Sequence, residues 1–376
     1  MLFTAAVLGI FVYGMIAAML GTILPDLSKK FSLTPKQNGN IALIQAVGLM
    51  IGSFSSGPLM DLTGVQTGML LGLALVALAL IVLRVANGYT VVTLSMLVLG
   101  LGGGMVVTGG NGMNSQIAAS LQTTTSSIAN LINLFFGLGG LVTPFVAANL
   151  FKSDTKKITA FAATAALLAL LASIVAPYPP PSGKVAFNFG VAAALLADPK
   201  VLLPALLLFL YVACEVGVWN WLVRHLIAQG VPEKRAMTIL SLGFALGLIV
   251  GRVGISQVLR TVDPKTVLIG AAVAMAVTTF LMLQSKSASV AWVAIFVGGL
   301  AMAPVFPTSL GFVGEAFKGG NQATAMGIVV TAGWAGIVAS SPIIGGIAGD
   351  DPKRLRRALL LLPAASIIMA VVAYAL

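Results

Sequence analysis

The chain has few charged residues and few of the side chains that catalysis and metal binding require. Only 8% of its 376 residues are charged, and it holds one histidine and one cysteine. One cysteine excludes an intrachain disulfide. One histidine without clustered acids favours neither a metal site nor a nucleophile–base pair. We therefore expect no enzyme activity, no metal and no cofactor.

Acidic residues are also scarce. The chain has 21 basic and 10 acidic residues, for a net charge of +11. In a soluble protein this excess would indicate nucleic acid as a partner. Here the basic residues gather at the ends of apolar segments, which is typical of loops in membrane proteins: Lys29, Lys30, Lys156, Lys157, Arg354, Arg356 and Arg357. We expect no nucleic-acid partner.

Apolar residues are abundant, at 59% of the chain, and the mean hydropathy is +1.05. A helix needs about 20 apolar residues to cross the bilayer, and its backbone groups are paired within the segment. The sequence therefore predicts an all-α protein that crosses the lipid bilayer twelve times. The expected spans are 3–25, 38–60, 65–83, 90–116, 124–151, 157–177, 201–224, 236–259, 265–284, 289–315, 321–348 and 356–375.

The longest polar connection, Pro177 to Lys200, opens with a proline-rich stretch that cannot continue a helix. It predicts an N-terminal six-helix bundle over 1–177, a linker over 178–200 and a C-terminal six-helix bundle over 201–376. The halves are faintly similar, since glycine-rich segments near 137–140 and 333–336 both run on to a proline. Two similar six-helix halves are typical of secondary transporters.

Glycines recur at a spacing of four, as in Gly100 and Gly104, or Gly243, Gly247 and Gly251. Small residues at this spacing let helices approach closely in lipid. We therefore interpret most of the glycines as packing residues. No strand precedes Gly100-Leu101-Gly102, so a dinucleotide-binding loop is not indicated.

Several segments together carry a family resemblance. Residues 57–64, with Asp61, resemble the loop between helices two and three of the major facilitator superfamily, although Leu62, Val65 and Gln66 stand where basic residues are expected. Other segments resemble the fucose–galactose–glucose:cation symporter family within it, and these are 108–111, 135–140 with Pro144, 211–217 with 219–221, 251–252 and 306–308. The resemblance implies two pseudo-symmetric six-helix bundles, cation-coupled sugar transport and a place in the inner (plasma) membrane.

The chain departs from that family at two places. Val107 precedes the Thr108–Asn111 element, where the family's sugar–proton symporters carry an acid, and Ala17 and Ala18 stand where the first helix often carries a polar or acidic residue. These departures leave Glu215 as the one acid near the middle of a span. An ionised carboxylate is costly at that depth and usually faces a cavity, a partner or a proton.

Tyr211, Glu215 and Trp219 follow one another at i, i+4 and i+8, so they share one helix face. We predict that Glu215 binds substrate hydroxyls and carries the coupling proton. The alternative is a protonated glutamate that is hydrogen-bonded to a neighbouring helix.

Amide side chains within spans form a second candidate set, because amides donate to and accept from sugar hydroxyls. Asn111 and Asn133 are predicted to contact substrate. Gln45, Asn114 and Asn130 are candidates for which interhelical hydrogen bonds are the alternative. Trp219 and Trp334 are candidate platforms for a sugar ring, whereas Trp221 and Trp292 lie closer to span ends. Asn111, Asn133, Glu215, Asn220 and Trp334 are expected to line one central cavity.

Asp61 and Arg252 stand at what look like corresponding ends of the second and eighth spans. We predict a gating role for both, and a solvated helix end is the alternative. His225, beside Arg224 at a helix end, is expected to be exposed.

The loops carry an unequal share of the basic residues. The odd-numbered loops hold most of them, including Lys36, Lys152, Lys234 and Arg235. The positive-inside rule would place these loops in the cytoplasm. The family resemblance instead places both termini there.

The leading hypothesis is a monomeric secondary transporter that moves a hexose-type sugar by alternating access, coupled to a proton or sodium ion. Alternatives are a sugar uniporter, an exporter of small amphipathic compounds, and a non-transporting membrane sensor or scaffold. The polar residues on inner faces favour a transport pathway.

Overall fold

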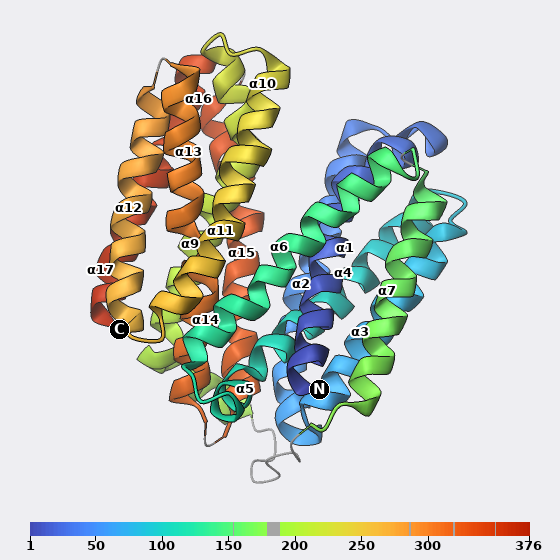
Figure 1. Cartoon of the computed structure of the whole chain (residues 1–376). Coiled ribbons are helices and arrows are strands. Elements are labelled where there is room, and N and C mark those ends of the chain that lie inside the picture. Colours follow the sequence, from blue (N-terminus) through green and yellow to red (C-terminus); the bar gives the residue numbers. More distant parts are fainter. Residues whose placement is uncertain (153, 179–188, 286, 319, 350) are drawn as a thin grey trace. The chain divides into compact units, whose positions relative to one another are not determined.

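The computed structural model describes residues 1–152, 154–178, 189–285, 287–318, 320–349 and 351–376. Every regular element in these ranges is helical (Figure 1). Within them, twelve helices are long and apolar enough to cross a membrane, which confirms the predicted fold class. The proline-rich part of the predicted linker, 179–188, lies outside the described residues.

The chain divides into two compact units. Unit 1 comprises Met1–Leu121, Ile132–Ala197 and Gly314–Thr331, and unit 2 comprises Gln122–Leu131, Asp198–Val313 and Ala332–Leu376. Two long helices, α6 and α15, are each divided between the units: the first turns of each helix pack with one unit and the remainder with the other.

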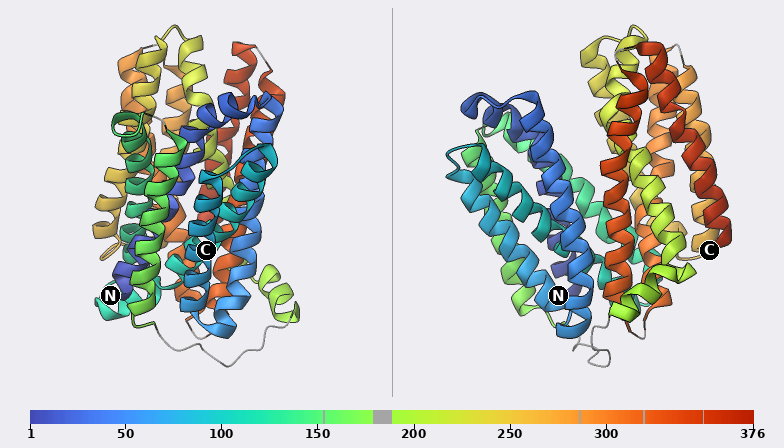
Figure 2. Two further views of the ribbon diagram at one scale, coloured as in Figure 1. Left: turned by 90° about the vertical axis from the view of Figure 1, so that its right-hand side faces the viewer. Right: turned by 180° about the vertical axis from the view of Figure 1, so that it is seen from behind.

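Unit 1 is built mainly from the first eight helices, coloured blue to green in Figures 1 and 2. Helix α4 packs against α2 and α3, and α7 packs against α1 and α3. The helices are α1 (Leu2–Phe31), α2 (Pro35–Thr63), α3 (Val65–Arg84), α4 (Tyr89–Gly112), α5 (Asn114–Ser120), α6 (Thr125–Asn149), α7 (Thr155–Val175) and α8 (Phe189–Ala197).

Unit 2 holds most of the remaining elements, coloured yellow-green to red. Helix α12 packs against α13 and α17, and α9 packs against α16 and α17. The elements are α9 (Pro199–Ala228), α10 (Glu233–Thr238), the π-helix η1 (Ile239–Ala245), α11 (Leu246–Val258), α12 (Pro264–Gln284), α13 (Ala288–Met302), α14 (Val305–Ala316), α15 (Gln322–Ala348), α16 (Pro352–Leu359) and α17 (Leu361–Ala375).

Glycines allow the closest helix pairs, as their spacing predicts. On α4, a Cβ atom at Gly104 would meet the backbone of α2, with the amide nitrogen of Ser53 only 2.6 Å away. In unit 2, a Cβ atom at Gly299 of α13 would lie 3.0 Å from the amide nitrogen of Leu248 on α11. Both pairs therefore pack backbone against backbone, which favours dispersion contacts where apolar burial gives no driving force.

Four predicted spans are interrupted. Residues 90–116 divide into α4 and α5 at Met113, and residues 236–259 divide into α10, η1 and α11. Residues 289–315 divide beside Pro304, and the last span divides at Leu360, three residues before Pro363. Proline removes the hydrogen bond to the carbonyl four residues earlier and clashes with it, which accounts for the last two interruptions. A further helix, α8, lies within the predicted linker.

Candidate functional site

Three asparagines form a buried amide cluster in unit 1. The Oδ1 atom of Asn111 on α4 accepts hydrogen bonds from Asn133 Nδ2 of α6 at 2.7 Å and from Asn114 Nδ2 of α5 at 3.2 Å. Its own Nδ2 donates to the carbonyl of Val107 at 2.9 Å. All three asparagines are at most 3% exposed. The break after α4 brings Asn114 back toward Asn111, so the cluster joins three helices.

The amide cluster keeps free hydrogen-bonding capacity. Within the described part of the chain, Asn114 Oδ1 and the hydroxyl of Thr108 are buried and have no hydrogen-bond partner. A buried polar group without a partner costs about 1–3 kcal/mol. Both atoms can accept a hydrogen bond, so a ligand hydroxyl that donates to either would offset that cost.

A charged pair lies in unit 2. Glu215, near the middle of α9, is half-buried and interacts electrostatically with Arg252 of α11, which is only 4% exposed. The Tyr211 hydroxyl, one turn before Glu215, lies beside the same carboxylate. Arg252 is thus a buried counter-charge to Glu215 and does not lie at a solvated helix end.

Aromatic rings extend this charged pair. The ring centroids of Tyr211 and Phe306 are 6.5 Å apart, and those of Phe306 and Trp334 are 6.2 Å apart. Trp334 is 6% exposed. Trp219 is 39% exposed and packs edge-on against Phe244 at 5.3 Å. Unit 2 therefore places two oppositely charged side chains that interact electrostatically beside flat apolar surfaces, a combination that suits a polar solute with an apolar ring face.

Asn220 and Gln45, two further residues predicted for the site, make contacts outside the amide cluster and the charged pair. Asn220 is exposed, and its Nδ2 donates to Ser341 Oγ of α15 at 2.7 Å. Gln45 is buried on α2, at a position where its backbone carbonyl lies against Gly100 of α4. The prediction that His225 is exposed is wrong, since the side chain is only 2% exposed and contacts Gln229 at 3.1 Å.

Asp61, near the end of α2, caps the start of α15 within unit 1. Its carboxylate accepts hydrogen bonds from the amide nitrogens of Ala323 and Thr324 at 3.1 and 2.8 Å, and from the Thr324 hydroxyl at 2.5 Å. A carboxylate at a helix N-terminus satisfies free N–H groups and interacts favourably with the helix dipole. Asp61 and Arg252 therefore have different partners.

Nothing in the sequence indicated some of the hydrogen-bond partners in unit 1. Gln322, at the start of α15, donates to the carbonyl of Gly112 at 3.0 Å and to Ser115 Oγ at 3.1 Å. No motif indicated Gln322 or Thr324. The pairing of Glu215 with Arg252 had a usable signal, because a basic residue within an apolar span requires an acidic partner.

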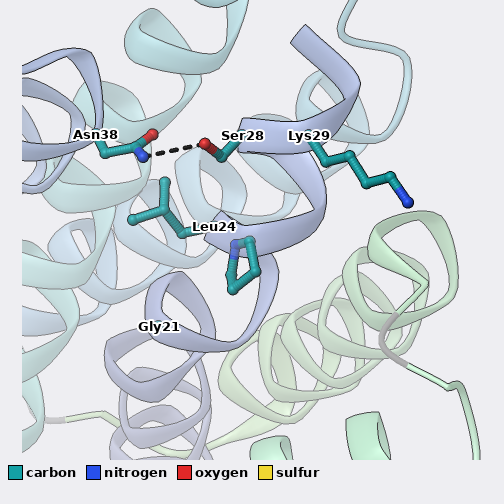
Figure 3. A pocket seen from close by; sticks show the side chains of 6 residues that line it. Gly21, Leu24, Ser28, Lys29 and Asn38 are labelled. Atoms are coloured by element: carbon teal, nitrogen blue, oxygen red, sulfur yellow. Dashed lines mark hydrogen bonds between the residues drawn. The ribbon is translucent and has the colours of Figure 1, made fainter. Parts of the chain in front are cut away.

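A surface cavity of about 460 Å³ lies in unit 1, near the end of α1. Figure 3 shows its lining, in which Asn38 Nδ2 donates to Ser28 Oγ at 3.1 Å. Pro25 interrupts the hydrogen bonding of α1 here, so the carbonyl of Gly21 loses its helical partner. None of the predicted site residues lines this cavity, so we do not assign substrate binding to it.

Comparison with known proteins identifies the family. A profile described as the Major Facilitator Superfamily matches residues 6–339. "Bypass of stop codon protein 6" of Saccharomyces cerevisiae is 26% identical over 269 residues, covering 64% of this chain and 53% of the yeast protein. The chain thus spans about half the length of that relative. "Protein TsgA" of Salmonella schwarzengrund is 23% identical over 292 residues, covering 76% of this chain and 72% of that protein.

Solved structures share the fold. The transporter FucP in its outward conformation aligns with a TM-score of 0.85 at 18% identity, covering 99% of this chain and 97% of FucP. The proton:xylose symporter XylE aligns with a TM-score of 0.79 at 13% identity, covering 100% of this chain and 94% of XylE. The human organic anion transporter MFSD10 aligns with a TM-score of 0.80 at 16% identity, covering 99% of this chain and 98% of MFSD10. The chain is a multi-pass membrane transport protein, not an enzyme, and it belongs to the major facilitator superfamily.

Proposed function

We propose that this secondary transporter moves a hexose-type sugar across the inner (plasma) membrane by alternating access, coupled to a cation and acting as a monomer. Membership of the superfamily establishes transport of a small molecule as the activity. The resemblance to the fucose–galactose–glucose:cation symporters supports the choice of a sugar. The observation that carries the proposal is the cluster of Glu215, Arg252, Tyr211, Phe306 and Trp334 in unit 2.

That cluster offers the two kinds of contact that a hexose needs. Glu215 accepts hydrogen bonds from sugar hydroxyls, and Arg252 donates to them. The ring of Trp334, with Phe306 6.2 Å away, offers an apolar surface to one face of a pyranose. Within unit 1, the unpaired Asn114 Oδ1 and Thr108 hydroxyl are a separate pair of candidate acceptors for substrate hydroxyls.

Coupling in this proposal rests on Glu215. The family's acidic position before Thr108 is occupied by Val107, and Ala17 and Ala18 leave the first helix without an acid at mid-span. Protonation of Glu215 would remove its electrostatic attraction to Arg252. Proton binding and substrate binding would then involve the same residues, so each would change the affinity of the cluster for the other.

Sugar binding to the purified protein tests the site. Isothermal titration with a panel of hexoses should give a dissociation constant for at least one of them, and Asn111→Ala should weaken it roughly five- to a hundred-fold, because losing one buried polar partner costs about 1–3 kcal/mol. Asn149→Ala is the matched control, since Asn149 is an exposed amide at the end of α6 whose Nδ2 bonds only to Phe145 within its own helix. Unchanged affinity in both Asn111→Ala and Asn133→Ala would remove the amide cluster from the site.

One observation favours a second candidate substrate, a small organic anion. Arg252 is a buried cation that interacts electrostatically with Glu215. A substrate carboxylate could take the place of Glu215 once that residue is protonated, and the arginine would then be paired in both states. Counterflow competition decides between the two candidates. If the substrate is a sugar, neutral hexoses should displace the labelled substrate. If monocarboxylates displace it and neutral hexoses do not, the substrate is an anion.

A further inference from the structure

Helix α16 is a short basic helix with one buried apolar face. Its eight residues, Pro352–Leu359, include four basic side chains, and Asp351 caps its first turn by accepting a hydrogen bond from the amide nitrogen of Lys353 at 2.8 Å. Leu355, Ala358 and Leu359 are each about 1% exposed. The apolar face therefore packs into unit 2, where α16 contacts α9, and the basic side chains point away from it. Figures 1 and 2 show α16 leading into α17.

The four basic side chains are only partly engaged. Arg354 Nε lies 3.9 Å from Asp351 Oδ2, and 70% of the Arg354 side chain is exposed. Arg356 donates to the side-chain oxygen of Gln284 at the end of α12. In the part of the chain that the structure describes, Lys353 and Arg357 form no ion pair, and both are exposed. Positive charge on this helix thus exceeds what Asp351 neutralises.

Apolar surface begins one turn beyond the basic residues. Leu360 and Leu361 follow Arg357 at three and four positions, and they are 40% and 42% exposed. Leu360 joins α16 to α17 and Leu361 begins α17, so the apolar surface starts directly after the basic helix. Ile367 and Ile368 of α17 continue the exposed apolar surface, at 59% and 50%. Together these residues belong to the twelfth candidate span, Pro352–Ala375, so the apolar part faces a bilayer and the basic part lies at its edge.

We propose that Lys353, Arg357, Leu360 and Leu361 form a binding site for an anionic glycerophospholipid. Lys353 and Arg357 stand one helical turn apart and would hold the headgroup phosphate between them by charge-assisted hydrogen bonds. The acyl chains would lie along Leu360 and Leu361. A phosphatidylcholine carries its own cation next to the phosphate, so it gains less from the two basic residues. The basic residues followed by apolar residues match the headgroup and the acyl chains of a phospholipid in the same order. A bound lipid would anchor the start of the last span at the membrane surface.

Lipid titration of the full-length protein in neutral detergent tests the proposal. Short-chain phosphatidylglycerol and phosphatidylcholine are added, and bound lipid is counted by native mass spectrometry while the melting temperature is followed. Phosphatidylglycerol should bind wild type more tightly and raise its melting temperature more than phosphatidylcholine does. The Lys353→Gln, Arg357→Gln variant should bind phosphatidylglycerol at least tenfold more weakly, because it loses both charge-assisted contacts with the headgroup phosphate.

The matched control is Lys234→Gln, Arg235→Gln, which removes the same charge from the exposed surface of α10 in the same unit. It should retain wild-type affinity for phosphatidylglycerol. Equal losses in both variants would show that the attraction depends on net charge alone, and equal binding of the two lipids by wild type would overturn the site altogether. A third variant, Leu360→Ser, Leu361→Ser, distinguishes a lipid headgroup from a soluble phosphate as the ligand. This variant should bind phosphatidylglycerol more weakly, but soluble glycerophosphate should bind to it as tightly as to wild type.

Discussion

Glu215 and Arg252 interact electrostatically in unit 2, and the stability of variants tests this pairing. Removing one partner of a buried ion pair leaves an uncompensated charge and typically costs about 3–5 kcal/mol. We expect Glu215→Gln and Arg252→Gln each to lower the melting temperature of the purified protein. The double variant should be less destabilised than the sum of the two, because it leaves neither charge alone. Strictly additive losses would mean that the two side chains do not interact.

The function of the pair gives a separate prediction. Glu215→Gln cannot release a proton but keeps an amide that binds hydroxyls. It should still exchange labelled substrate for unlabelled substrate, while accumulation driven by a pH gradient disappears. The measurement is counterflow and gradient-driven uptake on the same proteoliposome preparation. A wild type that responds to neither pH nor sodium gradients would make the protein a uniporter and Glu215 a substrate ligand only.

Asp61 gives a residue-scale prediction about gating. Asp61→Asn keeps the size of the side chain but removes the charge that faces the start of α15. Asparagine offers one acceptor oxygen where the carboxylate offers two, so hydrogen bonds to a charged group, which contribute about 1.5–3 kcal/mol each, are lost. We expect a changed transport rate with little effect on substrate affinity. Asp263→Asn is the control, because Asp263 caps the exposed start of α12 by accepting from the amide nitrogen of Thr266 at 3.1 Å. Equal rates in wild type and Asp61→Asn would exclude the gating role.

At the scale of elements, the helix pair α2–α4 depends on glycine. A methyl group at Gly104 would meet the backbone of Ser53 at 2.6 Å, so Gly104→Ala must push the helices apart. Overpacking of this kind costs about 1–3 kcal/mol, and the melting temperature should fall. Gly254→Ala on α11 is the control: nothing lies within 4 Å of its Cβ position, and alanine favours a helix more than glycine does. A stable Gly104→Ala protein would contradict the backbone packing described for this pair.

Local sequence predicted the positions of the helices but not their interruptions. Long apolar runs make the twelve spans visible, because hydropathy acts over a whole segment. Pro304 and Pro363 were visible in the sequence, yet a proline only permits a break and tertiary packing decides whether one forms. The π-helix η1 has no such marker. Within it, Gly243 lies against Trp292 of α13, where a Cβ atom would be 3.1 Å from the indole ring.

The candidate site could be predicted from the sequence only in part, because tertiary packing decides which side chains meet. Asn111 and Asn133 are singled out in the sequence because amides can donate to and accept from sugar hydroxyls, and the structure joins them by a hydrogen bond. The partner of Glu215 could not be derived from spacing, because Arg252 lies on a different helix and its direction depends on the turns within η1. Asn220 is expected from the sequence to line the same cavity as Glu215, and in the structure its Nδ2 donates to Ser341 Oγ.

At the scale of the whole molecule, the central claim is cation-coupled transport of a hexose. The direct measurement is uptake of radiolabelled hexoses into proteoliposomes that contain the purified protein, with and without imposed pH and sodium gradients. The account predicts that at least one hexose accumulates above its external concentration when a gradient is imposed, and that Glu215→Gln abolishes accumulation while exchange continues. If the protein transports an organic anion but takes up no hexose under any gradient, this account is wrong.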